Sequence, residues 1–229
     1  MTTIAANLQA VRNRIERAAQ SAGRDPSAIA LIAVSKTWPA ACIAEAYACG
    51  QGAFGESYAQ EALGKIMQLG DLPLAWHFIG PIQSNKTRAI AGHFQWVHSV
   101  ARAKIAERLN DARPAGLPPL NVCIQVNVSG EAGKSGVQPG EQLALARAIA
   151  ALPRLKLRGL MAVPEPTPDT RLQRQRFALL RELKDGLGAM GLALDTLSMG
   201  MSDDLESAIL EGATMVRVGT AIFGQRQKN

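Results

Sequence analysis

A lysine follows a run of apolar residues in the first fifth of the chain. Ile29 to Val34 are all apolar, as expected of a strand covered on both faces, and Ser35 and Lys36 come directly after them. Lysine is almost never fully buried without a partner. Two interpretations of this stretch stay open: Lys36 marks the point where an ordinary strand reaches water, or it is an amine at the rim of a pocket.

A second group of residues with chemical potential lies in the last thirty positions. Arg217 stands inside the apolar run MVRVGTAIFG and must find a partner or a wet cavity. Gly219 and Thr220 follow it, and they offer close backbone approach and a hydroxyl. Ser202, followed by two aspartates, predicts a helix N-cap. The alternative is that exposed N–H groups at this helix start bind an anion.

The elements that would position these residues alternate along the chain. Eight β-rich runs are separated by segments with apolar spacing near 3.6 residues. The runs are Ile29–Lys36, Ala53–Glu56, Ala75–Gly80, Trp96–Val100, Asn121–Val128, Lys156–Val163, Thr196–Gly200 and Met215–Phe223. The pattern predicts an α/β fold, a single (β/α)8 TIM-type barrel over residues 1–229 with an extra N-terminal helix that covers the gap left by a final helix. An open doubly wound sheet is the alternative.

A barrel would bring Lys36, Ser202, Arg217, Gly219 and Thr220 to one rim, because the C-terminal ends of its strands share a face. Barrel enzymes commonly hold phosphate in the loops after strands seven and eight. An amine, a phosphate cradle and a fixed cation in one pocket suit pyridoxal 5′-phosphate (PLP). Lys36 would form an imine with the aldehyde, and Arg217 would face the pyridine nitrogen and make the ring a weaker electron sink.

Two glycine motifs do not fit the sites they suggest. Gly50 to Gly55, GQGAFG, matches a dinucleotide fingerprint but follows a helical pattern instead of a strand. The GKS of Gly133 to Ser135 lacks the glycine that a P-loop requires, because Val128 occupies that position.

The histidines indicate packing more than chemistry. His77 lies in the third strand run, where a core histidine bonded to backbone is the usual interpretation and a ligand contact the alternative. His93 and His98 share no metal-like spacing with cysteines or acids, which favours ordinary packing.

Composition narrows the class of protein further. The formal net charge is +6, but the chain has no basic run with interleaved aromatics, so nucleic-acid binding is not expected. Arginines on the predicted helices indicate solvated faces. Three cysteines without metal spacing fit reduced thiols in the cytoplasm. No apolar run approaches the roughly 20 residues that cross a bilayer.

Six segments carry a resemblance to a known family: AVSKTWP, FGESYAQE, WHFIGPIQSNKTR, SGEAGKSGV, LRGLMAV and LSMGMSDDLESAILEGATMVRVGTAIFG. They resemble the pyridoxal phosphate homeostasis protein family, which are single-domain barrels similar to the N-terminal domain of bacterial alanine racemase. The resemblance implies a PLP-binding lysine at Lys36, phosphate contacts from Ser202, Gly219 and Thr220, and an arginine by the pyridine nitrogen at Arg217.

The chain departs from the family pattern at one place. The family usually reads G-E-N-Y after the second strand, whereas this chain reads GESY, with Ser57 in the asparagine position. The shorter hydroxyl would lose a hydrogen bond to the cofactor's ring oxygen or reach it through water. Ser57 is still counted among the candidate cofactor contacts, as is His77 of the third strand run.

Three functions remain open from the sequence. The resemblance implies a PLP carrier in vitamin B6 and amino-acid homeostasis, without robust catalysis of its own, for which apo PLP-dependent enzymes are candidate recipients. We expect a monomer, because no long exposed apolar stripe remains after the core is assigned. The alternative is a PLP-dependent amino-acid racemase of low activity, which needs a second base that only Tyr58 beside the pocket loop could supply. A Schiff-base aldolase is the third option and predicts no bound chromophore.

Overall fold

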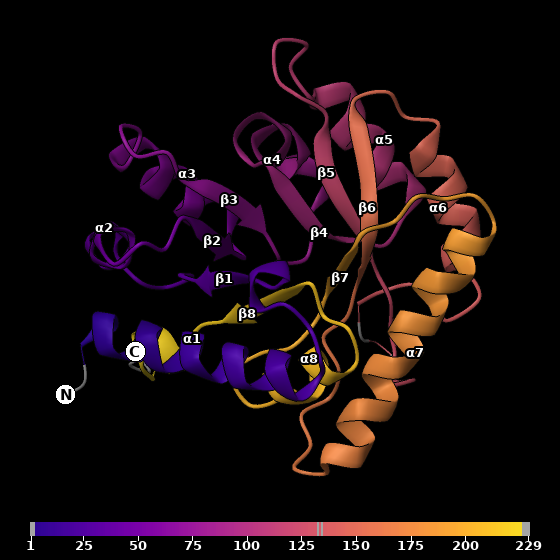
Figure 1. The fold of residues 1–229 in the computed structure, drawn as a ribbon. Coiled ribbons are helices and arrows are strands. Elements are labelled where there is room, and N and C mark those ends of the chain that lie inside the picture. Colours follow the sequence, from indigo (N-terminus) through magenta and orange to yellow (C-terminus); the bar gives the residue numbers. More distant parts are fainter. Residues whose placement is uncertain (1–2, 132, 134, 226–229) are drawn as a thin grey trace.

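The computed structural model describes residues 3–131, 133 and 135–225. Within them, eight parallel strands close into a barrel in the order β1-β2-β3-β4-β5-β6-β7-β8 (Figure 1). The strands are β1 (Ala30–Val34), β2 (Ala53–Glu56), β3 (Ala75–Phe78), β4 (Trp96–Val100), β5 (Leu120–Gln125), β6 (Leu155–Met161), β7 (Thr196–Ser198) and β8 (Met215–Val218). The predicted barrel is confirmed, and the open doubly wound sheet is excluded.

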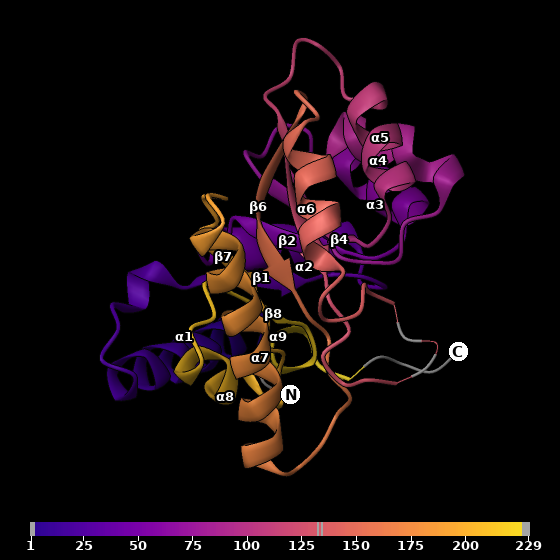
Figure 2. The same ribbon diagram turned by 90° about the vertical axis from the view of Figure 1, so that its right-hand side faces the viewer.

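Helices follow the strands and cover the outside of the barrel (Figure 2). The α-helices are α1 (Ile4–Ser21), α2 (Ala40–Ala48), α3 (Ala59–Gln68), α4 (Thr87–His93), α5 (Ala103–Ala112), α6 (Gln142–Ala150), α7 (Thr170–Ala189), α8 (Leu205–Leu210) and α9 (Thr220–Phe223). Short 3₁₀ turns, η1 (Pro26–Ala28) and η2 (Ser84–Lys86), precede β1 and α4.

The main hydrophobic core lies between the strands and the helices. Trp76 and Phe78 of β3 belong to it, and Phe78 meets Phe94 edge to face with ring centroids 5.4 Å apart. Because successive strand residues point to opposite faces, His77 points into the barrel. In β8, Val216 and Val218 belong to the same core. In β3 and β8, strand alternation therefore places polar side chains inside the barrel and apolar side chains against the helices.

Helix α1 takes the place of a full-length eighth barrel helix, as the sequence predicted. The helix after β8, α9, has a single turn, and α1 packs against both α8 and α9. Asn7 of α1 donates a hydrogen bond from Nδ2 to the carbonyl of Ile222 at 2.8 Å. Leu8, Val11 and Ile15 form the buried stripe of α1.

Two sequence predictions about the end of the chain are wrong in their boundaries. Strand β8 ends at Val218 instead of Phe223, because the chain turns at Gly219 and a helical turn begins at Thr220. Ser202 is not the helix N-cap, because α8 begins at Leu205 and Asp204 occupies the cap position. The Asp204 carboxylate accepts the Met201 N–H at 2.6 Å and so tightens the turn that contains Ser202.

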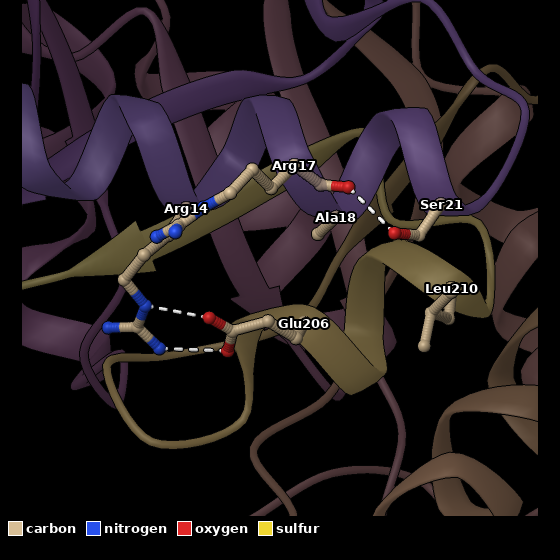
Figure 3. A pocket seen from close by; sticks show the side chains of 6 residues that line it. All are labelled: Arg14, Arg17, Ala18, Ser21, Glu206 and Leu210. Atoms are coloured by element: carbon tan, nitrogen blue, oxygen red, sulfur yellow. Dashed lines mark hydrogen bonds and ion pairs between the residues drawn. The ribbon is translucent and has the colours of Figure 1, made fainter.

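Several helix arginines lie on partly solvated faces, as the sequence indicated, and also form ion pairs. Arg14 of α1 binds both carboxylate oxygens of Glu206 on α8, at 2.7 and 2.8 Å (Figure 3). Arg174 and Arg181 of α7 both pair with Glu211, whose side chain is buried. These contacts join helices across the outer layer, and a buried carboxylate such as Glu211 requires them.

The glycine motif GQGAFG has the context that excludes a dinucleotide site. Gly50 has a φ of +79° directly after α2, and Gly55 lies inside β2. The motif therefore runs from a helix end into a strand, the reverse of the required order. Lys134 of the GKS sequence lies outside the described residues.

Candidate functional site

The strand order brings the predicted residues to the C-terminal mouth of the barrel. Strands β1 and β8 are neighbours, with Ala33 paired to Val218, so Lys36 and Gly219 follow adjacent strand ends. The carbonyl of Gly200 accepts the N–H of Arg217 at 2.9 Å, which joins the end of β7 to β8. Lys36 itself is half-buried.

The turns after β7 and β8 lie against each other. The Ser202 hydroxyl accepts the N–H of Ala221 at 3.4 Å. A Cβ on Gly219 would lie 3.2 Å from the carbonyl oxygen of Val34, so glycine allows this turn to approach β1. Gly200 has a φ of +93°, and a Cβ there would lie 2.6 Å from that of Ala208. The two turns are therefore fixed in place, with the hydroxyl-bearing residues Ser202 and Thr220 on them.

Arg217 is a buried cation with neutral partners. Its side chain is 3% exposed, and it donates from Nη1 to Ser198 Oγ at 2.6 Å and from Nη2 to the carbonyl of Ala162 at 2.9 Å. Burial lowers the pKa of Arg217 to about 10, so it stays charged at neutral pH. Within the described residues its side chain bonds a hydroxyl and a carbonyl and forms no ion pair. The interior thus holds a positive charge without a carboxylate in direct contact.

Two histidines continue the polar contacts of Arg217 into the barrel. His98 places Nδ1 2.7 Å from Ser198 Oγ, and His77 places Nδ1 2.9 Å from His98 Nε2. Burial lowers the pKa of His77 to about 3 and that of His98 well below its ordinary value. Both imidazoles are therefore neutral at physiological pH.

The sequence interpretation of these histidines needs correction. His77 bonds a side chain, where the usual interpretation expected backbone, and His98 belongs to a polar chain where ordinary packing was expected. Neither His98 nor Ser198 was predicted as part of the site. The one available signal was that both are polar residues at central or terminal positions of predicted strands.

The residue after Lys36 has a rare backbone conformation. Thr37 has a φ of +69°, and it is the one non-glycine residue with a positive φ in the described part of the chain. Its N–H donates to Glu61 Oε1 at 2.6 Å, and the N–H of Trp38 donates to the Ser35 carbonyl at 3.0 Å. The turn that carries Lys36 is therefore held by a carboxylate from α3.

A buried carboxylate holds the residue before Lys36. Ser35 donates from Oγ to Glu56 Oε1 at 2.7 Å, and Lys65 Nζ bonds the same oxygen at 2.7 Å and the Ser35 carbonyl at 2.8 Å. Burial raises the pKa of Glu56, although the Lys65 contact opposes this. The second oxygen, Oε2, is buried without a hydrogen-bond partner. Sequence reasoning missed Glu56 and Glu61, although both lie in FGESYAQE.

Ser57 lies at the same mouth, directly after β2, and is half-buried. A Cβ on Gly80 would lie 2.3 Å from the Ser57 carbonyl oxygen, so the ends of β2 and β3 pack closely. The next residue, Tyr58, stands at the start of α3 with its side chain 54% exposed. The role of Ser57 as a cofactor contact stays a prediction.

Sequence comparisons place this barrel among known proteins. The family model described as "Alanine racemase, N-terminal domain" matches residues 6–227. A pyridoxal phosphate homeostasis protein from Pseudomonas aeruginosa is 66% identical over 226 residues, which cover 99% of this chain and 97% of that protein. The chain belongs to the pyridoxal phosphate homeostasis protein family. The pyridoxal phosphate homeostasis protein of Escherichia coli K12 is 55% identical over 232 residues, covering 99% and 98% of the two chains.

A solved structure of similar fold holds the cofactor of the family name. The structure of PipY from Synechococcus elongatus PCC7942 with PLP bound is 40% identical to this pyridoxal phosphate homeostasis family member, with a TM-score of 0.80. The match covers 92% of this chain and all of that one, 100%.

Two other kinds of site are not found in the described residues. None of the helices there is both long and apolar enough to cross a membrane. The same residues contain no cluster of three or more histidine, cysteine or acidic side chains that could hold a metal ion.

Proposed function

We propose that the chain binds pyridoxal 5′-phosphate covalently through Lys36 at the C-terminal mouth and serves in PLP and amino-acid homeostasis, without robust catalysis of its own. The observation that carries this proposal is the convergence of Lys36, the buried cation Arg217 and the turns of Ser202 and Thr220 at one mouth. When bound, PLP supplies an aldehyde that combines reversibly with amines and a ring that withdraws electrons.

The donor set at this mouth fits PLP. Lys36 offers a half-buried amine for the aldehyde carbon. Ser202 and Thr220 offer hydroxyls, and Gly219 offers a turn without a side chain, for the phosphate. Arg217 offers a buried guanidinium whose direct partners are neutral, for the pyridine nitrogen. Ser57 and His77 remain proposed contacts to the ring.

Arg217 favours storage of the cofactor over catalysis. A guanidinium that faces the pyridine nitrogen donates a hydrogen bond and disfavours protonation of that nitrogen. The unprotonated ring is a weaker electron sink, so loss of a substrate proton is less assisted. This supports a carrier instead of an efficient enzyme.

A weak racemase is the second candidate function, because the matching family model is that of an alanine racemase domain. Racemisation needs a base on each face of the substrate carbon, and Lys36 supplies one. The second would have to be Tyr58, which is exposed, because Tyr47 lies on the outer helix α2. The described residues thus offer no buried tyrosine opposite Lys36.

An absorbance spectrum tests the proposed function. We expect the protein, as purified or after addition of PLP, to be yellow, borohydride to fix the colour, and peptide mapping to locate it on Lys36. A colourless protein that takes up no PLP would contradict the proposal and favour an aldolase. Sustained racemisation of alanine enantiomers at about 1 per second or faster, followed by optical rotation, would overturn the carrier role.

We also propose that the protein is a cytoplasmic monomer that delivers PLP to apo PLP-dependent enzymes. The exposed large apolar side chains are scattered over different elements, which supports a monomer. Light scattering should give a mass near 24.3 kDa. A twofold larger mass would contradict the monomer, and unchanged reactivation of an apo-enzyme in the presence and absence of the loaded protein would contradict delivery.

A further inference from the structure

A chain of buried polar side chains runs from Arg217 across the barrel interior. It passes from Arg217 Nη1 to Ser198 Oγ at 2.6 Å, on to His98 Nδ1 at 2.7 Å, and from His98 Nε2 to His77 Nδ1 at 2.9 Å. All four side chains are at most 3% exposed. They come from β8, β7, β4 and β3.

One arrangement of donors and acceptors satisfies every contact within this chain, and it leaves only the Nε2–H of His77, at the far end, without a partner in the chain. Guanidinium groups only donate, so Ser198 Oγ accepts from Arg217 and must send its own hydrogen elsewhere. His98 Nδ1 is the acceptor within reach, so it carries no proton. A neutral His98 then carries its proton on Nε2 and donates it to His77 Nδ1.

In the reverse direction, the Ser198 hydroxyl would lose its hydrogen-bond acceptor. If His77 Nδ1 donated to His98, then His98 Nδ1 would donate to Ser198 Oγ. The Ser198 oxygen would accept twice, and its hydroxyl hydrogen would have no acceptor among the contacts of the described residues, in a fully buried site. An unsatisfied buried donor is costly, and the cation at Arg217 polarises the Ser198 hydroxyl toward donation.

We infer that Ser198, His98 and His77 form a hydrogen-bond chain of fixed direction, with both imidazoles protonated on Nε2, and that this chain positions the Arg217 guanidinium for the cofactor ring. The second half of this inference rests on the proposed function. Ser198 and the Ala162 carbonyl hold two different nitrogens of Arg217, which fixes the plane of the guanidinium. These three side chains are positioning residues that act through Arg217.

The far end of the chain is also fixed in orientation. His77 stacks on Trp96 of β4, with ring centroids 5.6 Å apart and an interplanar angle of 9°. The Arg158 guanidinium carbon lies 4.7 Å from the centroid of the Trp96 ring. The imidazole of His77 is therefore clamped in its plane, and the direction set at Ser198 extends to the opposite side of the barrel.

Nitrogen-15 NMR of the PLP-free wild-type protein tests the direction of the chain. We expect His77 and His98 to show an unprotonated Nδ1 and a protonated Nε2 throughout about pH 6 to 8. His93, the third histidine, is the internal control, because its Nδ1 contacts the Ala89 carbonyl and must donate to it. A protonated Nδ1 on His98 would overturn the inference.

Substitution of Ser198 tests whether the chain positions Arg217. In Ser198→Ala we expect His98 to lose its single tautomer, the absorbance maximum of bound PLP to shift, and PLP affinity to fall about tenfold. Ser198→Thr keeps the hydroxyl and should retain the wild-type spectrum. Ser207→Ala is the matched control, because it removes a buried hydroxyl that bonds Gln173 in the outer layer.

The outcomes separate this inference from the proposed function. Failure of the wild-type protein to bind PLP would remove the proposed function, while the NMR experiment would still decide the direction of the chain. Unchanged PLP affinity and spectrum in Ser198→Ala, or equal losses in Ser207→Ala, would overturn the positioning role.

Discussion

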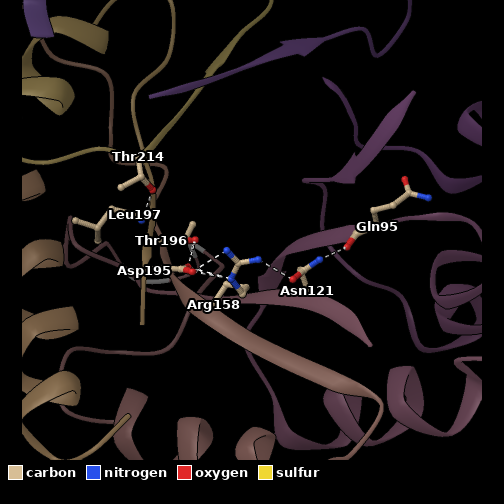
Figure 4. A network of polar contacts seen from close by, with 7 residues as sticks. All are labelled: Gln95, Asn121, Arg158, Asp195, Thr196, Leu197 and Thr214. Carbon is tan, nitrogen blue, oxygen red and sulfur yellow. Dashed lines mark hydrogen bonds and ion pairs between the residues drawn. The ribbon is translucent and has the colours of Figure 1, made fainter. Parts of the chain in front are cut away.

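The charged side chains at the two mouths of the barrel differ in how completely they are hydrogen-bonded. At the N-terminal mouth, Arg158 donates three hydrogen bonds of 2.7 to 3.1 Å to Asp195 and one of 2.9 Å to Asn121 (Figure 4). The same guanidinium lies over Trp96. Asn121 in turn donates to the carbonyl of Gln95 at 3.1 Å. Arg158, Asp195 and Asn121 therefore all have hydrogen-bond partners within the chain.

The C-terminal mouth leaves comparable groups less satisfied. Arg217 has neutral partners, Glu56 has a buried oxygen without one, and Thr37 has a strained backbone. Such features persist only where the surrounding structure holds them, and they cluster at functional sites. The comparison shows that the N-terminal mouth pairs its charged groups within the chain, whereas the C-terminal mouth keeps polar groups with incomplete partners, as the proposed PLP site requires.

The largest effect should come from Lys36→Ala at the C-terminal mouth. Covalent attachment of PLP should be abolished, because the amine is gone, while weak binding through the phosphate turns remains. Borohydride labelling measures covalent attachment, and spectrophotometric titration measures the remaining affinity for PLP. Lys156→Ala, which removes an exposed lysine at the start of β6, is the control and should change neither. Undiminished labelling of Lys36→Ala would contradict the proposed attachment site.

Arg158→Ala at the N-terminal mouth should lower the stability of the protein and leave PLP binding intact. We expect the protein to lose about 1–2 kcal/mol of unfolding free energy, since hydrogen bonds and a cation–π contact disappear together. PLP affinity measured by spectrophotometric titration should stay unchanged, because Trp96 still stacks on His77 and the contacts of Arg217 remain. A parallel loss of affinity would show that the mouths are not independent.

The stability difference between wild type and Arg158→Ala should depend on pH. Burial acts to raise the pKa of Asp195, but hydrogen bonds from Arg158 and Thr196 outweigh it, so the pKa is lowered. A depressed carboxyl pKa contributes stability above the unfolded value of about 3.9, and this contribution is lost as pH falls through the folded value. Urea unfolding at a series of pH values from neutral into this acid range should show the difference narrowing. A difference that is constant across the range would contradict this origin.

Glu61→Ala should weaken PLP binding at the C-terminal mouth without unfolding the protein. The Glu61 side chain is 31% exposed and Lys65 keeps Glu56 as a carboxylate partner, so the fold should tolerate the change, but the N–H of Thr37 loses its acceptor. We expect a roughly 3- to 10-fold weaker PLP affinity, the worth of one hydrogen bond. Glu61→Gln keeps an oxygen for Thr37 and should recover part of the affinity. The control is Glu45→Ala, which removes an exposed carboxylate of α2. Equal affinity in Glu61→Ala and wild type would show that this contact does not position Lys36.

The smallest effect should come from Thr37→Gly. Glycine adopts the observed φ of +69° without a Cβ penalty, so the PLP-free protein should gain about 0.5 kcal/mol or less of unfolding free energy. Chemical denaturation measures the change. A loss of stability would show that the Thr37 side chain contributes more than the backbone strain costs.

The sequence was sufficient for the barrel because buried parallel strands appear as apolar runs at regular intervals. It was insufficient at Gly219, because the apolar residues of GTAIF suit a strand or a helix equally. The turn of Ser202 was misassigned because Ser202 and Asp204 both have cap-forming side chains. The neighbouring strand ends that bring Lys36 to Gly219 follow from barrel closure alone.

The interior hydrogen-bond chain was beyond sequence reasoning for a physical reason. His98 and Ser198 are 100 positions apart, and their contact depends on which inward-facing positions of β4 and β7 reach across the barrel. Alternation along a strand gives the face of a side chain but not its depth. The contact of Glu56 with Ser35 likewise depends on how β2 pairs with β1, and that of Glu61 with Thr37 depends on how α3 packs there.

The position of α1 has a consequence for the order of folding. Asn7 and its partner Ile222 are 215 residues apart, so the apolar stripe of α1 is synthesised long before α8 and α9 exist to cover it. During translation α8 and α9 cannot cover this stripe until the last fifth of the chain has been synthesised. The native environment of the earliest helix is therefore supplied by the latest residues, and α1 cannot reach it before they emerge.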